Sequence, residues 1–127
     1  MRIIVPCVDL IHERYDEEYG QFLRSKIGGD GSLESSIQSI IVNWEHKAVW
    51  TTKALQAILE ALGFKTVSLA PRESCFPEMV GIDGHAAAIG GHANWVESGV
   101  VEAVKWHDQP TNGGGKYPPL QKIPACQ

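Results

Sequence analysis

A continuous apolar run near the N-terminus restricts the fold more than any other segment. Residues 2–8 are mostly β-branched or otherwise apolar, and they do not alternate with polar residues. A strand with one face in water alternates, whereas a strand covered by helices on both faces reads as an unbroken apolar run. We therefore predict a buried strand over 2–8. It should end near Pro6, because proline cannot donate a hydrogen bond to a neighbouring strand.

Composition places the chain among globular proteins of one domain. The 127 residues are 43% hydrophobic and 20% charged, with a net charge of −4 that argues against nucleic acid as a partner. No apolar run approaches the roughly 20 residues that span a bilayer, and the first residues do not form a secretory signal. Cys7, Cys75 and Cys126 show no metal-binding spacing, so we expect three free thiols and a cytoplasmic protein.

Two helices are expected between this strand and residue 42. Apolar residues spaced by three and four from Ile11 to Leu23 predict an amphipathic helix of about four turns that stops at Gly28-Gly29. Asp9 stands where an N-cap or first-turn acid belongs. Residues 32–41 favour a short second helix, although residues 40–42 would also suit a strand.

The clearest local signal is a helix over 52–62. Thr51 can accept hydrogen bonds from the first-turn amides, and Trp50 and Leu55 match the spacing of a hydrophobic staple. Gly63 follows the last apolar position and can adopt the left-handed conformation that ends a helix.

The remaining pattern predicts an α/β fold with a three-stranded mixed sheet. Strands are expected at about 2–8, 64–70 and 99–106, the last two antiparallel because no crossover helix is evident in the irregular segment 71–97. With two or three helices, these elements form one domain over 1–107. Residues 108–127 are rich in glycine and proline and are expected to be an extended tail.

Several short segments, in order, carry a resemblance to a known family. The segments are Ile3-Ile4-Val5-Pro6, Gly28-Gly29, His46-Lys47-Ala48-Val49-Trp50-Thr51, Ile58-Leu59-Glu60-Ala61-Leu62-Gly63-Phe64 and Val100-Val101-Glu102-Ala103-Val104-Lys105. With these segments in this order, the chain resembles the C-terminal half of a class I (Rossmann-like) S-adenosylmethionine-dependent methyltransferase of the sugar- and polysaccharide-associated type.

The resemblance implies a partial Rossmann-like methyltransferase fold in which strand 99–106 lies antiparallel between strands 2–8 and 64–70. The family's cofactor-binding turn and acidic residue precede the matched part, so no cofactor-binding residue is expected in this chain, and Cys7 stands where the family tends to have an acid. S-adenosylmethionine would bind only if a partner completed the fold. The open edge of strand 2–8 implies a homodimer or another protein that covers it.

The resemblance also suggests where an acceptor would bind. His46 precedes the helix that borders the family's acceptor pocket, and histidine titrates near neutral pH, so His46 is the candidate catalytic base. Trp50, Asp83 and His85 are candidate substrate-binding residues. Structural roles compete with these assignments, since His46 could fix a loop through a backbone hydrogen bond and tryptophan is often a core residue.

Three functional hypotheses follow, and whether the chain is an enzyme stays open. The first is a methyltransferase-like protein that is catalytically incomplete alone and acts through self-association or a protein partner. The second is the acceptor-side part of a methyltransferase that another chain completes. The third is a small metal-dependent enzyme using His85 and His92, with Asp83 as a further ligand and with His107-Asp108 added if the loop folds back on the last strand. A nucleophilic role for Cys7 lacks a supporting motif.

Overall fold

The computed structural model describes residues 1–42 and 48–105. Its elements, in chain order, are β1 (Arg2–Pro6), α1 (Val8–Arg14), α2 (Glu17–Ile27), α3 (Leu33–Val42), α4 (Thr52–Ala61), β2 (Phe64–Leu69), a 3₁₀ turn η1 (Pro77–Met79), α5 (His85–Ile89), α6 (Gly91–Glu97) and β3 (Ser98–Lys105). None of the helices within these residues is long and apolar enough to cross a membrane. The chain is therefore α/β, with more helices than the two or three that the sequence predicts.

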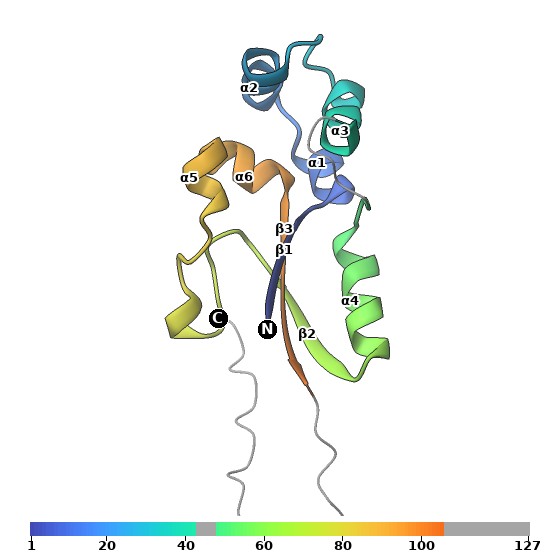
Figure 1. The fold of residues 1–127 in the computed structure, drawn as a ribbon, viewed down its shortest axis with the longest axis vertical. Coiled ribbons are helices and arrows are strands. Elements are labelled where there is room, and N and C mark those ends of the chain that lie inside the picture. The colour runs from blue at the N-terminus through green and yellow to red at the C-terminus, as the bar shows by residue number, and fades with distance from the viewer. Residues whose placement is uncertain (43–47, 106–127) are drawn as a thin grey trace, which may run out of the picture.

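The three strands form one sheet in the order β1-β3-β2 (Figure 1). Ile4 pairs with Val100 and Val67 pairs with Glu102, and both pairings are antiparallel. The antiparallel pairing of the last two strands is confirmed, and β3 holds the central position. The prediction of a mixed sheet is wrong, because every pair among the described strands is antiparallel. This order and these directions differ from those of a parallel Rossmann sheet.

The apolar run of β1 does not come from a strand with helices on both of its faces, which is what the sequence suggested. Ile3 and Val5 pack on the side of the sheet that α4 covers, against a cluster that includes Leu55 and Val101. Ile4 lines cavities together with Met79 of η1 and His85 of α5, on the other side of the sheet. The apolar residues on both faces of β1 therefore indicate that other parts of the chain cover both faces. They do not indicate whether β1 runs parallel or antiparallel to its neighbour. All five residues of β1 are half-buried, as befits an edge strand.

Helix α4 begins and ends as predicted. Thr51 accepts a hydrogen bond from the Ala54 N–H at 3.1 Å, and Gly63 has a φ of +82°. Asp9 contributes from α1, because its Oδ2 accepts hydrogen bonds from the Thr52 N–H at 3.0 Å and the Thr52 hydroxyl at 2.6 Å. The carboxylate satisfies an exposed first-turn donor and lies at the positive end of the α4 dipole. Asp9 thus joins the first turn of α1 to that of α4.

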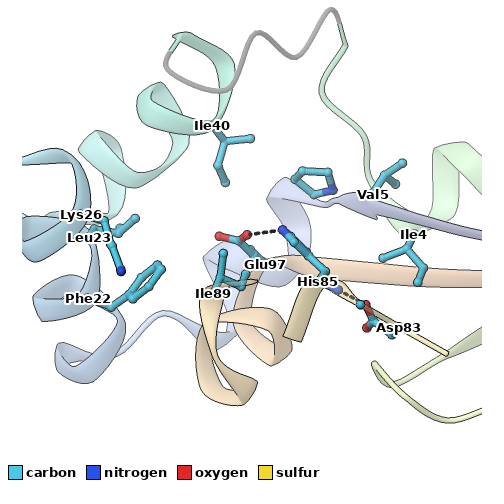
Figure 2. Close-up of a pocket in the computed structure, with 12 residues that line it drawn as sticks. Ile4, Val5, Phe22, Leu23, Lys26, Ile40, Asp83, His85, Ile89 and Glu97 are labelled. Carbon is cyan, nitrogen blue, oxygen red and sulfur yellow. Dashed lines mark hydrogen bonds and ion pairs between the residues drawn. The ribbon is translucent and has the colours of Figure 1, made fainter. Parts of the chain in front are cut away.

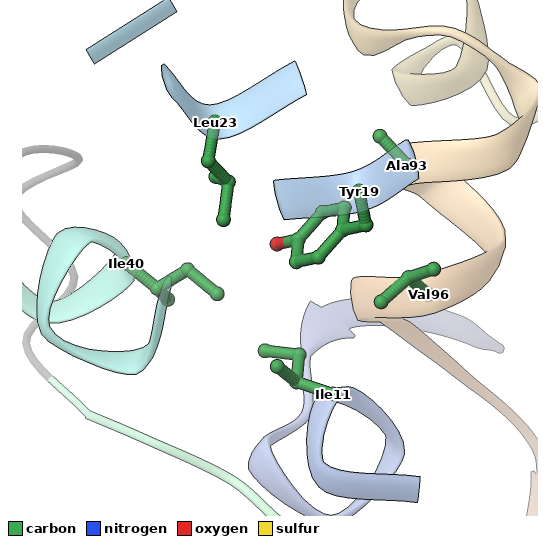
Figure 3. Packing of buried hydrophobic residues seen from close by; sticks show 6 residues of the cluster. All are labelled: Ile11, Tyr19, Leu23, Ile40, Ala93 and Val96. Carbon is green, nitrogen blue, oxygen red and sulfur yellow. The ribbon is translucent and has the colours of Figure 1, made fainter. Parts of the chain in front are cut away.

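A second core forms where the helices meet beyond the end of β1. Figure 3 shows its side chains, which come from α1, α2, α3 and α6: Ile11, Tyr19, Leu23, Ile40, Ala93 and Val96. The single helix predicted over this region is divided into α1 and α2. Asp16 separates them because its side chain accepts from the Tyr19 N–H at 2.9 Å and caps the new helix.

Two further predictions meet different outcomes. Helix α3 is confirmed over the residues that also suited a strand, and Ser32 accepts from the Ser35 N–H at its start. The segment 71–97 is not irregular, because it contains η1, α5 and α6. Alanine has the highest helix propensity of all residues, and in this segment it outweighs the low helix propensity of the glycines.

The cysteines also differ from the expectation of three free thiols. Cys75 is disulfide-bonded, so the expectation is wrong for this residue. Cys7 is a free, buried thiol, and Cys126 lies outside the described residues. The cytoplasmic expectation rested in part on reduced cysteines, and it stays a prediction.

We predict that Gly99→Ala destabilises the fold. Gly99 lies on β3, where an added Cβ would overlap the Cys7 Sγ and approach the Thr52 Cγ2 to 3.0 Å. Overpacking of this kind costs about 1–3 kcal/mol of unfolding free energy, measurable by urea denaturation. Gly84→Ala is the matched control, because nothing lies within 4 Å and its φ of −75° suits alanine. A Gly99→Ala protein as stable as wild type would contradict the packing described.

Candidate functional site

A cavity lies beside β1, at the end where that strand leads into α1. Its volume is about 450 Å³, within the range of small-molecule sites. We call it the β1 pocket. It is lined by Ile4, Val5, Pro6, Phe22, Leu23, Lys26, Ile40, Asp83, Gly84, His85, Ile89 and Glu97 (Figure 2). Most of these side chains are apolar, so the polar groups among them would fix the orientation of a ligand.

An imidazole and a carboxylate face each other in this pocket. His85 is the first residue of α5, and its Nε2 lies 3.8 Å from the Oε1 of Glu97 at the end of α6 (Figure 2). The Glu97 side chain is only 11% exposed. The buried Tyr19 hydroxyl donates to Glu97 Oε2 at 2.7 Å. Burial raises the pKa of Tyr19, and the charge of Glu97 raises it further, so the phenol stays protonated and donates.

A series of buried hydrogen bonds holds His85 on the side away from Glu97. Asp83 Oδ2 accepts from Asn94 Nδ2 at 2.9 Å, and its Oδ1 accepts from the His85 backbone N–H at 2.9 Å. The Ser98 hydroxyl lies 2.8 Å from Asn94 Oδ1 and 3.1 Å from His85 Nδ1. Asn94 and Ser98 are at most 1% exposed, so their polar groups depend on these partners.

The order of donors along this chain fixes the imidazole tautomer. A carboxylate only accepts, so the amide nitrogen of Asn94 faces Asp83 and the amide oxygen faces Ser98. The Ser98 hydroxyl then donates to that oxygen, and its own oxygen accepts from His85 Nδ1–H. In neutral His85 the unprotonated nitrogen is therefore Nε2, on the side of the pocket and of Glu97. This nitrogen can accept a proton from a bound ligand, and Glu97 would stabilise the imidazolium that results.

The structure brings some of the predicted site residues together. Asp83 and His85 both line the β1 pocket and are joined by a hydrogen bond. Trp50 does not line it; it packs against the cluster of Leu55 under α4, and its carbonyl accepts from the Val8 N–H at 2.9 Å. His46 lies outside the described residues, so its proposed role as a base stays a prediction.

His85 and His92 serve separate contacts. His92 Nε2 lies 3.0 Å from Asp16 Oδ1, and its ring stacks on Trp95 with centroids 6.0 Å apart. Within residues 1–42 and 48–105, no group of three histidine, cysteine or acidic side chains could hold a metal ion. The geometry thus offers the metal hypothesis no support, and His107-Asp108 lie outside the described residues.

Cys7 is packed as a core residue. Its side chain is fully buried, and burial, with a further contribution from the Asp9 charge, raises the pKa of the thiol to about 11. A nucleophilic cysteine needs the opposite shift, because the thiolate is the reactive form. A catalytic role for Cys7 is therefore not supported.

Sequence reasoning missed the residues that complete the site: Tyr19, Asn94, Glu97 and Ser98. The spacing of Asn94 and Ser98, four residues apart, is a helical signal that could have been found once a helix was placed there. The pairing of Tyr19 with Glu97 had no such signal, because these residues are 78 positions apart.

Comparisons with protein-family models, characterised proteins and solved structures find no match to this chain.

We predict that neutral His85 carries its proton on Nδ1, which ¹⁵N–¹H correlation spectra of the imidazole report directly. Ser98→Ala removes the acceptor of that proton, so the Nε2–H tautomer should gain population. Ser68→Ala, at an exposed position of β2, should leave the tautomer unchanged. A wild-type His85 that is mainly in the Nε2–H form would refute the hydrogen-bond order described above.

We also predict a loss of stability in alkaline solution that depends on Cys7. The unfolded thiol loses its proton near pH 9, whereas the folded thiol keeps it to about pH 11. Rising pH therefore favours the unfolded state, by up to about 1.4 kcal/mol per pH unit. Between pH 9 and 10, below the ordinary pKa of tyrosine, urea denaturation should show this slope in wild type. Cys7→Ser should be less stable and lack this slope, and equal slopes would contradict the burial of a protonated thiol.

Proposed function

We propose that the chain is a methyltransferase-like domain that binds a small acceptor molecule and acts together with a second chain, either another copy or a different protein. The placement of β3 between β1 and β2 supports this proposal, because the resemblance implied the same arrangement. The β1 pocket adds support, since it lies at the carboxyl end of β1 and offers a small acceptor molecule a place to bind.

The described residues do not fit S-adenosylmethionine. A cofactor turn between a strand and a helix needs glycines for the close approach of the backbone. Here β1 passes into α1 through Pro6 and Cys7, without a glycine, and Cys7 is fully buried. The Asp83-Gly84-His85 segment leads from a loop into a short helix and belongs to the β1 pocket. We therefore assign this chain no step through the cofactor.

The observation that carries the proposal is the His85–Glu97 pair within an apolar pocket. Apolar walls favour a ligand with an apolar body, and His85 Nε2 can accept a hydrogen bond from one hydroxyl or amine. Proton removal by a histidine of this kind prepares an oxygen or nitrogen to act as a nucleophile. The Ser98 hydroxyl holds the imidazole in place through Nδ1, and Glu97 would offset the positive charge that the ring gains.

A second chain has a place to bind. Among the described residues, β1 pairs with β3 on one edge and no strand pairs with the other edge. Unpaired backbone groups on an edge strand are a template for a strand from another molecule. This edge is the part of the surface where we place the second chain.

Titration calorimetry tests the acceptor pocket with 4-ethylphenol, a probe that has an apolar body and one hydroxyl. We predict that wild type binds it and that His85→Gln weakens binding about tenfold, or about 1.4 kcal/mol. His12→Gln, at an exposed histidine of α1, is the control and should bind as wild type does. Equal affinity of His85→Gln and wild type would refute the role of His85.

Titration calorimetry also tests whether the chain alone binds S-adenosylmethionine. S-adenosylmethionine should produce no binding isotherm with the chain alone, and tight binding would overturn that part of the proposal. Light scattering on the same sample reports the mass in solution. A clean monomer at high micromolar concentration would exclude self-association and leave a different protein as the second chain.

A further inference from the structure

The β1 pocket presents two hydrogen-bond acceptors that face each other across a gap. In neutral His85 the Nδ1 proton is held by the Ser98 hydroxyl, so Nε2 is an acceptor. Glu97 Oε1 lies 3.8 Å from this nitrogen, which is too long for a direct hydrogen bond. A carboxylate oxygen only accepts, and it has more than one lone pair to offer. The pair therefore suits a bound group that carries at least two hydrogens on one atom.

A single nitrogen atom can bridge the two acceptors. Two atoms 3.8 Å apart can both lie at hydrogen-bond distance, about 2.9 Å, from a third atom. An ammonium group carries three hydrogens and can donate to His85 Nε2 and Glu97 Oε1 together. A hydroxyl carries one hydrogen and can donate to only one of them. The number of donors thus favours an amine over an alcohol.

Both side chains line the cavity and keep part of their surface exposed. The His85 side chain is 37% exposed and the Glu97 side chain is 11% exposed. Figure 2 shows the imidazole and the carboxylate pointing toward each other. The Tyr19 hydroxyl donates to the other carboxylate oxygen, Oε2, at 2.7 Å and keeps Oε1 on the side of the imidazole. A ligand can therefore use Oε1 while the hydrogen bond of Tyr19 stays in place.

The charges around the pocket also favour a cation. The carboxyl groups of Glu97 and Asp83 line it and are nearly buried, so solvent screens their charges only weakly. Lys26 lines the pocket from α2, on the side away from Asp83 (Figure 2), and is exposed to solvent that screens its charge. The charges of the described lining residues therefore give the interior of the pocket a negative potential.

A second cavity of the described residues adjoins the β1 pocket and does not change this balance. It has a volume of about 340 Å³ and is lined by Arg2, Ile4, Met79, Ile82 and Asp83. Arg2 Nη1 lies 2.9 Å from Glu102 Oε1, so the charge of Arg2 is already paired and does not offset that of Asp83. Ile4 and Asp83 line both cavities, which gives an apolar ligand room to extend along β1.

We propose that the β1 pocket selects a primary amine as its small acceptor molecule, with the nitrogen donating to His85 Nε2 and Glu97 Oε1. The apolar body of the amine lies against lining residues such as Ile4, Phe22 and Ile89. This inference rests on the proposed acceptor role of the pocket and narrows the acceptor from a hydroxyl or amine to a primary amine. The positive charge compensates the nearly buried carboxylate, which an alcohol cannot do.

Titration calorimetry tests the selection with 4-methylbenzylamine and 4-methylbenzyl alcohol, which have similar shape and differ in charge and in the number of donors. At pH 8 the amine is a cation, and it should bind wild type about tenfold more tightly than the alcohol. In parallel ¹⁵N NMR titrations, the His85 Nε2 resonance should shift as the amine binds. Equal affinities, or an unchanged Nε2 resonance while the amine binds, would overturn the inference.

Glu97→Gln isolates the role of the carboxylate. Glutamine keeps an oxygen that accepts from the Tyr19 hydroxyl, and its amide nitrogen then replaces the acceptor that faces His85. The amine and the alcohol should therefore bind this variant about equally. Glu13→Gln, at an exposed acid of α1, is the control and should keep the tenfold preference. Thermal melting establishes that each variant is folded. If Glu97→Gln does not fold, the wild-type titrations decide; if it folds and keeps the preference, the inference is refuted.

The outcomes separate this inference from the proposed function. If 4-ethylphenol and the alcohol bind through His85 and the amine binds no more tightly, the acceptor role stands and the selection of an amine fails. If 4-ethylphenol does not bind and the amine shows the tenfold preference with the Nε2 shift, the amine site stands and the binding of hydroxyl acceptors fails. If no probe binds, both are refuted.

Discussion

The Glu102 carboxylate lies at the centre of the sheet and holds three parts of the fold together. It is 1% exposed, on the central strand β3, and it accepts from Arg2 of β1 and from Ser74 and the Cys75 N–H of the loop after β2. Burial raises the pKa of this carboxyl, but its hydrogen bonds outweigh that effect and hold the pKa below its usual value. A buried charge is tolerated only with such partners, so the loop and β1 are bound to the position of β3.

The two cavities follow from this arrangement. With β1 at the edge of the sheet, the face that carries Arg2 and Ile4 is covered by the segment of η1 and α5, and gaps remain between the segment and the strand. Asp83 stands between them, since it lines both cavities. Its hydrogen bonds to Asn94 and the His85 N–H place the start of α5. Asp83, which lines both cavities, thereby positions the imidazole through the His85 backbone.

Local signals predicted the elements that depend on neighbouring residues. Helix α4 begins after Thr51 and ends before Gly63, as predicted, and the strands lie at the predicted apolar runs. These predictions succeeded because helix capping and strand propensity depend on only a few neighbouring residues. The antiparallel pairing of the last two strands was predicted and is confirmed, but the direction of β1 could not be predicted from its own residues. The run at 2–8 reports burial of two faces and is compatible with either parallel or antiparallel neighbours. The site was predicted in part: Asp83 and His85 were named, whereas Glu97 and Tyr19 meet only after the helices pack.

The pairing of β1 has a consequence for synthesis on the ribosome. The backbone partners of β1 lie on β3, about a hundred residues along the chain, and the Met1 N-terminus donates to the Ala103 carbonyl. β1 thus leaves the exit tunnel before β3 and cannot form its hydrogen bonds until β3 has followed. During translation its apolar side chains stay without their final neighbours, in a state that nascent-chain chaperones recognise. The sheet closes only when nearly the entire described chain has been made.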